Sequence, residues 1–263
     1  MRAKIAAVQF KTEQYEVERN ISKAERAIRG ASSKAELILF PEQFLTGPIG
    51  NRLELADLAK GMKSAMSELA RKHSVFIAAG SIVEKTAKGL RNRAYLFGKN
   101  GEELAHYDKM ALWKSEASRI TPGEGAVVVQ TPLGRIGFAI CWDLTNAALF
   151  EGMRAKSADM ILCPSIWWRG MESKGKEHDP LFAGKYLDAL CLSQAYRARA
   201  AILYANYAGS TSFGSFSDES IGHTQLTMPF RGKVACARGS GEQILYCEAD
   251  TKACDDAREY FSG

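Results

Sequence analysis

Three segments of the sequence each place a side chain capable of acid–base or nucleophilic chemistry just after an apolar run. Glu42 follows residues 37–40 and a proline, Lys109 follows a short predicted strand, and Cys141 follows residues 137–140. Strand ends are where α/β folds gather their active sites. A glutamate there is partly removed from water, which raises its pKa toward that of a general base.

Each of these side chains also has an ordinary structural explanation. Alone, Glu42 fits a surface turn, Lys109 a solvated strand end and Cys141 a buried structural position. A helical pattern at 144–153 follows Cys141, however. A thiol at a helix N-terminus has its thiolate stabilised by the helix dipole and by backbone N–H groups, which can also hold an oxyanion. We therefore expect Cys141 to be the most reactive thiol.

The other cysteines have no such context. Cys163 and Cys191 lie in apolar patterns and are expected to be buried, whereas Cys254 lies in a polar tail and is expected to be exposed, with an ordinary thiol pKa. Six cysteines in 263 residues are too few for a disulfide scaffold. No Cys-x-x-Cys or His-x-x-x-His spacing occurs, so we expect no metal. The chemistry open to Glu42, Lys109 and Cys141 requires no organic cofactor, so none is expected.

Several familiar active-site motifs are absent from the sequence. It contains no Gly-x-Ser-x-Gly elbow, no P-loop and no Gly-x-Gly-x-x-Gly, so serine-hydrolase and nucleotide-binding interpretations have no support. A cysteine–histidine protease is the competing thiol chemistry. Its histidine would have to be one of four that lie in no recognisable motif, namely His73, His106, His178 and His223.

Composition and charge describe an average soluble protein. Hydrophobic residues make up 46% and charged residues 25%, and the net charge is +5 with basic residues spread along the chain. A nucleic-acid binder usually shows a basic stripe, so no nucleic-acid partner is expected. The apolar stretch at 5–10 is too short for a secretory signal and no run suits a membrane span, so we expect a cytoplasmic protein with no membrane partner.

Short apolar runs alternate with one-faced helical patterns along the whole chain. Apolar positions at helical spacing predict helices over 17–31, 55–69 and 187–198. Strands are predicted at 5–10, 37–40, 75–79, 94–97, 127–130, 136–140, 160–163, 202–205 and 234–237. The mixture predicts an α/β fold with a sheet of mixed direction covered by helices, and no break in composition divides residues 1–263, so a single domain is expected.

The three reactive segments together resemble a known family. Phe40-Pro41-Glu42, Tyr107-Asp108-Lys109 and Ile140-Cys141-Trp142-Asp143 occur in this order, with 67 residues from Glu42 to Lys109 and 32 from Lys109 to Cys141. Order, spacing and strand-end context resemble the nitrilase superfamily of carbon–nitrogen hydrolases. The resemblance extends through residues 5–10, Gly80-Ser81, Arg91-Asn92-Arg93-Ala94, 121–123, Ala158-Asp159, Pro164, Trp167, Ala205-Asn206 and 229–232.

The resemblance implies a four-layer α-β-β-α sandwich of two mixed β-sheets flanked by helices, and a homodimer or higher homo-oligomer. It implies a catalytic trio of Glu42, Lys109 and Cys141, with Glu116, seven residues after Lys109, as a second glutamate that positions the substrate or the lysine. Trp142 and Trp167 lie near the trio in sequence and are expected to contact the substrate, with core packing as the alternative.

The implied function is an amidase that hydrolyses a small non-peptide amide through an acyl thioester. An N-carbamoyl-amine hydrolase or a nitrilase of the same superfamily, and a catalytically silent binding scaffold, are the alternatives. The chain departs from the common family pattern after the cysteine, where Thr145 and Ala148 replace an arginine and a glutamate, and in a later helix, which carries Gln194 and Arg197. The departures leave the substrate open.

Overall fold

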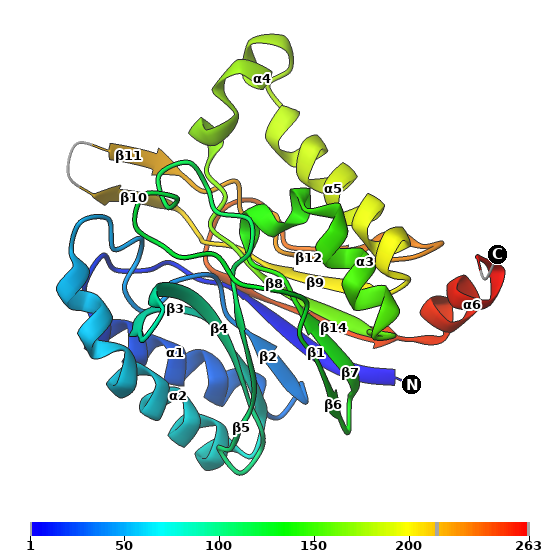
Figure 1. Cartoon of the computed structure of the whole chain (residues 1–263), viewed down its shortest axis with the longest axis horizontal. Helices are drawn as coiled ribbons and strands as arrows, with labels where there is room; N and C mark the ends of the chain where they lie inside the picture. Colours follow the sequence, from blue (N-terminus) through cyan, green and yellow to red (C-terminus); the bar gives the residue numbers. More distant parts are fainter. Residues whose placement is uncertain (1, 214–215, 262–263) are drawn as a thin grey trace.

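Two six-stranded sheets form the centre of the molecule, which a computed structural model describes over residues 2–213 and 216–261. The first sheet has the order β14-β1-β2-β3-β4-β5 (Figure 1). Its neighbours β1, β2 and β3 run parallel, and the other pairs are antiparallel. Its strands are β1 (Arg2–Gln9), β2 (Leu37–Leu39), β3 (Phe76–Thr86), β4 (Gly89–Phe97), β5 (Glu103–Asp108) and β14 (Gln243–Asp250).

The second sheet has the order β13-β12-β9-β8-β7-β6. The strands β7, β8 and β9 are parallel, while β6, β12 and β13 are antiparallel to their neighbours. Its strands are β6 (Val128–Thr131), β7 (Gly134–Phe138), β8 (Met160–Pro164), β9 (Ala201–Ala205), β12 (Gln225–Met228) and β13 (Gly232–Cys236). A separate hairpin consists of β10 (Ser210–Phe213) and β11 (Phe216–Glu219).

Alternation along β1 explains how the first sheet serves two cores. Successive side chains of a strand point to opposite faces. Ile5 and Ala7 belong to the core between the two sheets, whereas Ala6 and Val8 belong to the core beneath the helices. The side chains on both faces of β1 are apolar and buried. The sequence of the strand is therefore a nearly continuous apolar run.

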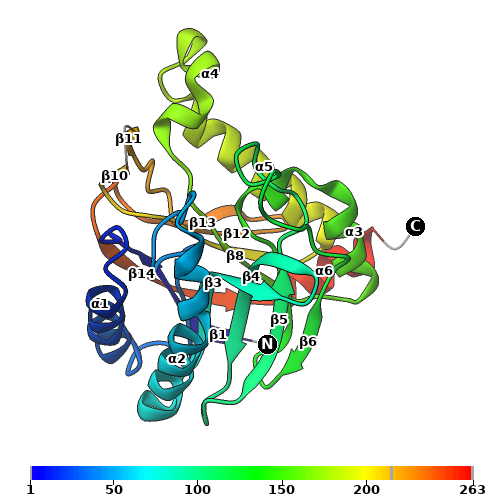
Figure 2. The ribbon, with the colours of Figure 1, turned by 60° about the vertical axis from the view of Figure 1, so that its left-hand side comes forward.

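Helices cover the outer face of each sheet (Figure 2). The first sheet is covered by α1 (Val17–Ala31) and α2 (Ala59–His73), and the second by α3 (Ala147–Ala155) and α5 (Phe182–Ala198). In α1 the buried Ala24, Ile28 and Ala31 recur at three- and four-residue spacing, which places them on one face. The remaining helical segments are η1 (Leu53–Leu58), η2 (Cys141–Thr145), η3 (Arg169–Glu172), α4 (Ser173–His178) and α6 (Lys252–Tyr260).

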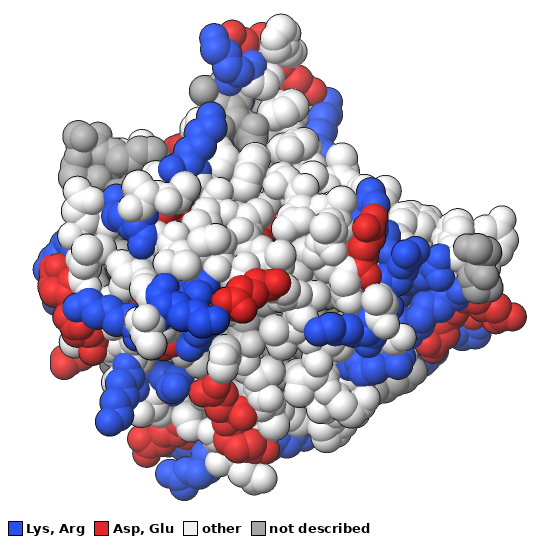
Figure 3. All heavy atoms as spheres, in the orientation of Figure 1, with Lys and Arg blue, Asp and Glu red and all other residues white. Residues whose placement is uncertain are grey.

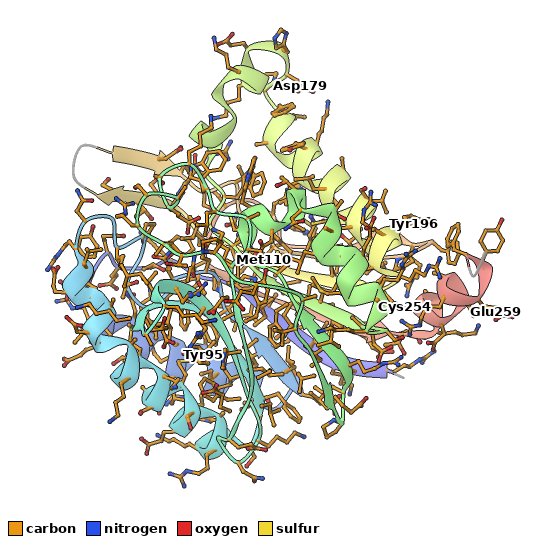
Figure 4. All side chains as sticks on the ribbon, viewed as in Figure 1. Tyr95, Met110, Asp179, Tyr196, Cys254 and Glu259 are labelled. Carbon is orange, nitrogen blue, oxygen red and sulfur yellow. The ribbon has the colours of Figure 1, made fainter. Side chains whose placement is uncertain are left out.

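The predicted α-β-β-α sandwich is confirmed, and the predicted helix over 17–31 coincides with α1. The predicted helix over 144–153 is wrong in one respect, because it is divided into η2 and α3 at Asn146. The Asn146 side chain accepts a hydrogen bond from the backbone N–H of Leu149 and so caps α3. The short α4 and the start of α5 project from the sandwich, and Figure 4 labels Asp179 near the tip of this projection.

Charged side chains of both signs are interspersed on the face shown in Figure 3. Among the described residues, none of the helices combines the length and apolar character that crossing a membrane requires.

Candidate active site

Three strand ends bring the predicted catalytic side chains to one cavity. Glu42 follows β2, Lys109 follows β5 and Cys141 follows β7, so the first two come from one sheet and the third from the other. All three line a cavity of about 420 Å³, together with Glu116 from the loop after β5 and Ile166 from the segment after β8. The sequence analysis therefore predicted correctly that each of the three residues lies at the end of a strand.

One ammonium and one amide join the two glutamates of the cavity. Lys109 Nζ donates hydrogen bonds to Glu42 Oε1 at 2.8 Å and to Glu116 Oε2 at 2.7 Å. Asn92 Nδ2 donates to the same Glu42 Oε1 at 2.7 Å and to Glu116 Oε1 at 3.1 Å. Sequence reasoning missed the contribution of Asn92, although the segment that contains it, Arg91-Asn92-Arg93-Ala94, carried part of the family resemblance.

The backbone of Ile166 lies between the glutamate and the thiol. Its N–H donates to Glu42 Oε2 at 3.1 Å, and its carbonyl oxygen accepts a hydrogen bond from the Cys141 thiol, with Sγ 3.4 Å away. Both oxygens of Glu42 are thereby held in place. The backbone of Ile166 thus connects the carboxylate and the thiol through two hydrogen bonds.

Burial controls the protonation states of the site. Burial raises the pKa of Glu42, an effect that Glu116 reinforces and Lys109 opposes. Burial also opposes a charge on Lys109, but Glu42 and Glu116 outweigh it and hold the pKa of Lys109 well above its usual range. Lys109 is therefore an ammonium at neutral pH.

The prediction of a stabilised thiolate at Cys141 is wrong for the resting site. Burial, followed by the negative charge of Glu42, raises the pKa of Cys141 to about 12, and Lys109 opposes this only in part. The expected helix dipole contributes little, because Cys141 begins a 3₁₀ helix of five residues rather than an α-helix. The cysteine rests as a neutral thiol and needs a neighbouring base to become a nucleophile.

Asp143 holds the backbone around Cys141. Its carboxylate accepts hydrogen bonds from the N–H of Ile140 at 2.8 Å, the N–H of Ala111 at 2.6 Å and the hydroxyl of Tyr107 at 2.8 Å. Cys141 itself has a φ of 50°, in the left-handed region that a side chain with a Cβ atom enters at a cost. This wholly buried carboxylate thus joins the loop after β5 to the strained turn at Cys141 after β7.

The prediction that the side chains of Trp142 and Trp167 contact the substrate is wrong. Trp113 and Trp168 are among the residues that line the cavity, and Trp142 and Trp167 are not. The Trp167 side chain is entirely buried, with its ring centroid 5.8 Å from that of Trp142 and 6.2 Å from that of Tyr186, so it packs in the core. In an extended segment a shift of one residue changes the face to which the side chain points.

The residues that depart from the family pattern form neutral contacts beside the site. Thr145 Oγ1 donates to the carbonyl oxygen of Trp142 at 2.8 Å, and Gln194 Nε2 donates to the carbonyl oxygen of Leu144 at 2.8 Å. Arg197 instead pairs with Glu151 near the surface, at 2.8 Å. The turn after the nucleophile is therefore supported here by hydroxyl and amide groups.

The burial of the remaining cysteines differs in part from the prediction. Cys163 and Cys191 are buried, as predicted. Cys254 is also buried, because it lies on the inner face of α6 with Ala257, and burial raises its pKa to about 12; the prediction of an exposed, ordinary thiol was wrong. Cys236 and Cys247 are half-buried.

The hydrogen bonds described for the histidines do not involve Cys141. His106 pairs with Glu103 at 2.8 Å and His223 with Asp188 at 2.9 Å. Among the described residues, the charged side chains grouped with Cys141 around the cavity are Glu42, Glu116, Lys109 and Arg119. A cysteine–histidine mechanism finds no support in this arrangement.

The chain belongs to the carbon–nitrogen hydrolase family, whose sequence profile matches residues 4–259. The chloroplastic omega-amidase of Arabidopsis thaliana is 28% identical over 258 residues, which are 91% of this chain and 66% of that protein. The omega-amidase of Bos taurus is 25% identical over 269 residues, which are 97% of this chain and 91% of that protein. The chain thus spans about two thirds of the plant relative and most of the bovine one.

Solved structures share the fold over essentially the whole chain. A carbon–nitrogen hydrolase from Helicobacter pylori G27 has a TM-score of 0.87 at 20% identity, covering 100% of this chain and 94% of that one. An amidase from Nesterenkonia sp. has a TM-score of 0.80 at 20% identity, covering 99% of this chain and 95% of that one. A variant of that amidase carries the acetamide moiety of fluoroacetamide on its active-site cysteine.

Proposed function

We propose that this chain is an amidase that hydrolyses a small non-peptide amide through an acyl thioester on Cys141. The observation that carries the proposal is the hydrogen-bonded pair of Glu42 and Lys109 in the same 420 Å³ cavity as the Cys141 thiol. Membership in the carbon–nitrogen hydrolase family and similarity to omega-amidases support an amide as the substrate. We propose that residues 1–263 act as one domain.

In the first half-reaction, Glu42 takes the thiol proton as Cys141 Sγ attacks the amide carbonyl carbon. The carbonyl oxygen becomes an oxyanion, which the Lys109 ammonium and the backbone N–H of Trp142 stabilise. Glu42 then gives the proton to the amide nitrogen, the C–N bond breaks and ammonia leaves. The acyl group remains on Cys141 as a thioester.

In the second half-reaction, Glu42 takes a proton from water as the water oxygen attacks the thioester carbon. The same oxyanion contacts hold the tetrahedral intermediate, and its collapse breaks the C–S bond. Cys141 recovers its proton from Glu42, and the carboxylic acid leaves. The net reaction consumes one water and one amide and returns both catalytic groups to their resting states.

Glu116 acts as a positioning residue in this mechanism. Its contact with Lys109 at 2.7 Å and its contact with the backbone N–H of Trp113 at 2.8 Å give the ammonium a second carboxylate partner beside Glu42. When Glu42 is protonated during turnover, the hydrogen bond from Lys109 to Glu116 remains. The ammonium therefore stays in place for the oxyanion.

Ammonia release from a panel of small amides, carbamoyl amines and nitriles tests the proposal. We expect release from amides, and its abolition in Cys141→Ala, while Cys236→Ala, in which a half-buried cysteine away from the cavity is replaced, keeps full activity. Release from carbamoyl amines alone or nitriles alone would replace the amidase with an N-carbamoyl-amine hydrolase or a nitrilase. If the folded protein released ammonia from none of these compounds, the amidase proposal would be rejected in favour of a catalytically silent binding scaffold.

We further propose a cytoplasmic homodimer. An aromatic surface formed by Tyr196, Phe230, Tyr260 and Phe261 supports association, since its rings contact one another while remaining 36–77% exposed. Figure 4 labels Tyr196 on α5. Light scattering at micromolar concentration is expected to give at least twice the chain mass of 28.8 kDa. A single species at the chain mass would contradict the dimer.

A further inference from the structure

Two buried hydroxyl groups near Cys141 have no role in the proposed mechanism. Ser165 directly follows β8 and Tyr204 lies on β9, and both residues are completely buried. Among the residues that the structure describes, neither Ser165 Oγ nor Tyr204 Oη makes a hydrogen bond of ordinary length and angle. Burying a polar group without a partner costs free energy, so most buried polar groups are paired. Two unpaired hydroxyl groups beside one thiol are unfavourable unless they form hydrogen bonds at another stage of the reaction.

The two hydroxyl groups lie on the same face of the second sheet. Cys163 on β8 is paired in register with Tyr204 on β9. The pairing continues just past β8, where the N–H of Ser165 donates to the carbonyl oxygen of Ala205 at 2.8 Å. Side chains two residues apart in an extended chain point to the same face. Ser165 and Tyr204 therefore project to the same side from neighbouring parallel segments.

Electrostatic interactions indicate that both hydroxyl groups lie near the sulfur. Burial is the largest cause of the high pKa of Cys141, and the Ser165 hydroxyl acts against it. Burial, followed by the charge of an ionised Cys141, raises the pKa of Tyr204 well above its usual range, and Ser165 again acts in the opposite direction. Ser165 thus interacts with both groups. Tyr204 keeps its proton at neutral pH and can donate a hydrogen bond.

Ionisation reverses the hydrogen-bonding role of the sulfur. The neutral thiol donates to the carbonyl oxygen of Ile166, and this contact is lost when the proton passes to Glu42, because a thiolate can only accept. Two of the three N–H groups of Lys109 are bound to Glu42 and Glu116, and the third is needed for the oxyanion. The buried thiolate therefore requires another donor, and the O–H of Ser165 is uncommitted in the resting site.

We propose that Ser165 donates a hydrogen bond to the thiolate sulfur of Cys141, and that Tyr204 positions Ser165 by donating to its Oγ. The inference rests on the proposed role of Cys141 as the nucleophile and adds the group that stabilises it when its proton moves to Glu42. A serine hydroxyl has one donor and two acceptor sites, so it can serve both neighbours at once. Hydrogen bonds to charged acceptors are roughly twice as strong as neutral ones, so Ser165 favours the thiolate over the thiol.

The rate at which methyl methanethiosulfonate labels Cys141 at pH 8 tests the inference. This small neutral reagent transfers a methylthio group to a thiolate and releases methanesulfinate, and the mass of the Cys141 peptide reports the extent of labelling. We expect Ser165→Ala to slow labelling about 3- to 15-fold. Loss of a hydrogen bond to a charged group lowers the thiolate fraction about 10- to 100-fold, and the greater nucleophilicity of the more basic thiolate offsets part of this loss.

The role of Tyr204 is tested by a double-mutant cycle. Tyr204→Phe should slow labelling by less than Ser165→Ala does, because it removes only the group that orients the donor. It should have no further effect when Ser165→Ala is already present, since Tyr204 acts through Ser165. Additive effects of the two substitutions would reject this role of Tyr204.

Stability distinguishes a thiolate donor from a structural side chain. Because Ser165 Oγ is unpaired in the resting site, Ser165→Ala should leave the urea midpoint of unfolding unchanged or raise it. A side chain kept for function is expected to show lower reactivity without lower stability when it is removed. Slower labelling together with a lower urea midpoint would assign Ser165 to the structure and overturn the inference.

Ser220→Ala is the matched control. Ser220 is as buried as Ser165, but its Oγ donates to the carbonyl oxygen of Tyr207 at 2.7 Å. Its replacement should therefore lower the urea midpoint and leave the labelling rate of Cys141 unchanged. Equal slowing in Ser220→Ala, or the native rate in Ser165→Ala, would overturn the inference.

Labelling requires no amide hydrolysis, which separates this inference from the proposed function. If the native chain released ammonia from no amide but labelling slowed in Ser165→Ala, the thiolate donor would be supported and the amidase rejected. Ammonia release by the native chain, together with unchanged labelling in Ser165→Ala, would retain the amidase and reject the role of Ser165.

Discussion

Replacing Glu42 by glutamine should move the ionisation and the reactivity of Cys141 in opposite directions. With a pKa of about 12, the thiol is ionised in roughly one chain in 10⁴ to 10⁵ at pH 7.5. The negative charge of Glu42 is one cause of that high value. Its removal leaves the Lys109 ammonium nearby and should lower the pH at which Cys141 ionises by about one to three pH units.

Turnover should nevertheless fall by about 10²- to 10⁴-fold in Glu42→Gln, the usual contribution of a general base. The variant has more thiolate but lacks the group that returns a proton to the leaving nitrogen. Ionisation is followed by thiolate absorbance near 240 nm between about pH 8 and 12, a range that includes both expected midpoints, with Cys141→Ala as the baseline. Turnover is followed by ammonia release at pH 7.5.

Glu68→Gln, which changes an exposed glutamate on α2, serves as the control for both measurements. It should alter neither the titration nor the rate. Circular dichroism verifies that Glu42→Gln remains folded. An unchanged or higher ionisation pH for Cys141 would show that Glu42 does not raise the pKa of the thiol, and undiminished turnover would show that it is not the base.

Three further outcomes are expected. Because burial raises the pKa of Glu42, kcat/KM should fall as pH decreases through a midpoint above the usual range of a glutamate, and a midpoint at or below it would contradict that base. Chloroacetamide should alkylate Cys141 before the half-buried Cys236, with a competing amide protecting only Cys141; mass mapping decides this. Asp143→Ala should lower the free energy of unfolding in urea by about 3–5 kcal/mol, and Asp143→Asn by less, because alanine leaves several buried donors unpaired; equal losses would contradict this account.

The residues of the candidate site could be predicted from the sequence, but the pKa of its thiol could not. Glu42, Lys109 and Cys141 could be located because each follows an apolar strand, a local pattern. The thiol pKa could not be predicted in the same way. It depends on burial between two sheets and on the charge of Glu42, which is 99 residues away in the chain. Contacts at such separations leave no local pattern.

Some short helices and strands could not be predicted from local sequence patterns either. Cys254 and Ala257 form the buried face of α6, but nine residues of mostly polar sequence gave too weak a periodicity to predict that helix. The strand β14 was also not predicted. In β14 most residues are only half-buried, and the strand is defined by its antiparallel pairing with β1 rather than by its own composition.

The division of the site between two sheets makes hydrolysis a measure of complete folding. A chain in which only the first sheet has formed holds Glu42 and Lys109 without the proposed nucleophile, and the second sheet alone holds Cys141 without its proposed base. The first sheet, moreover, places β1 beside β14, so Arg2 is paired with Asp250 and nearly the whole chain must be present to close it. Recovery of turnover during refolding should therefore coincide with the slowest structural phase. A truncated chain, or one whose synthesis is incomplete, should have no hydrolytic activity.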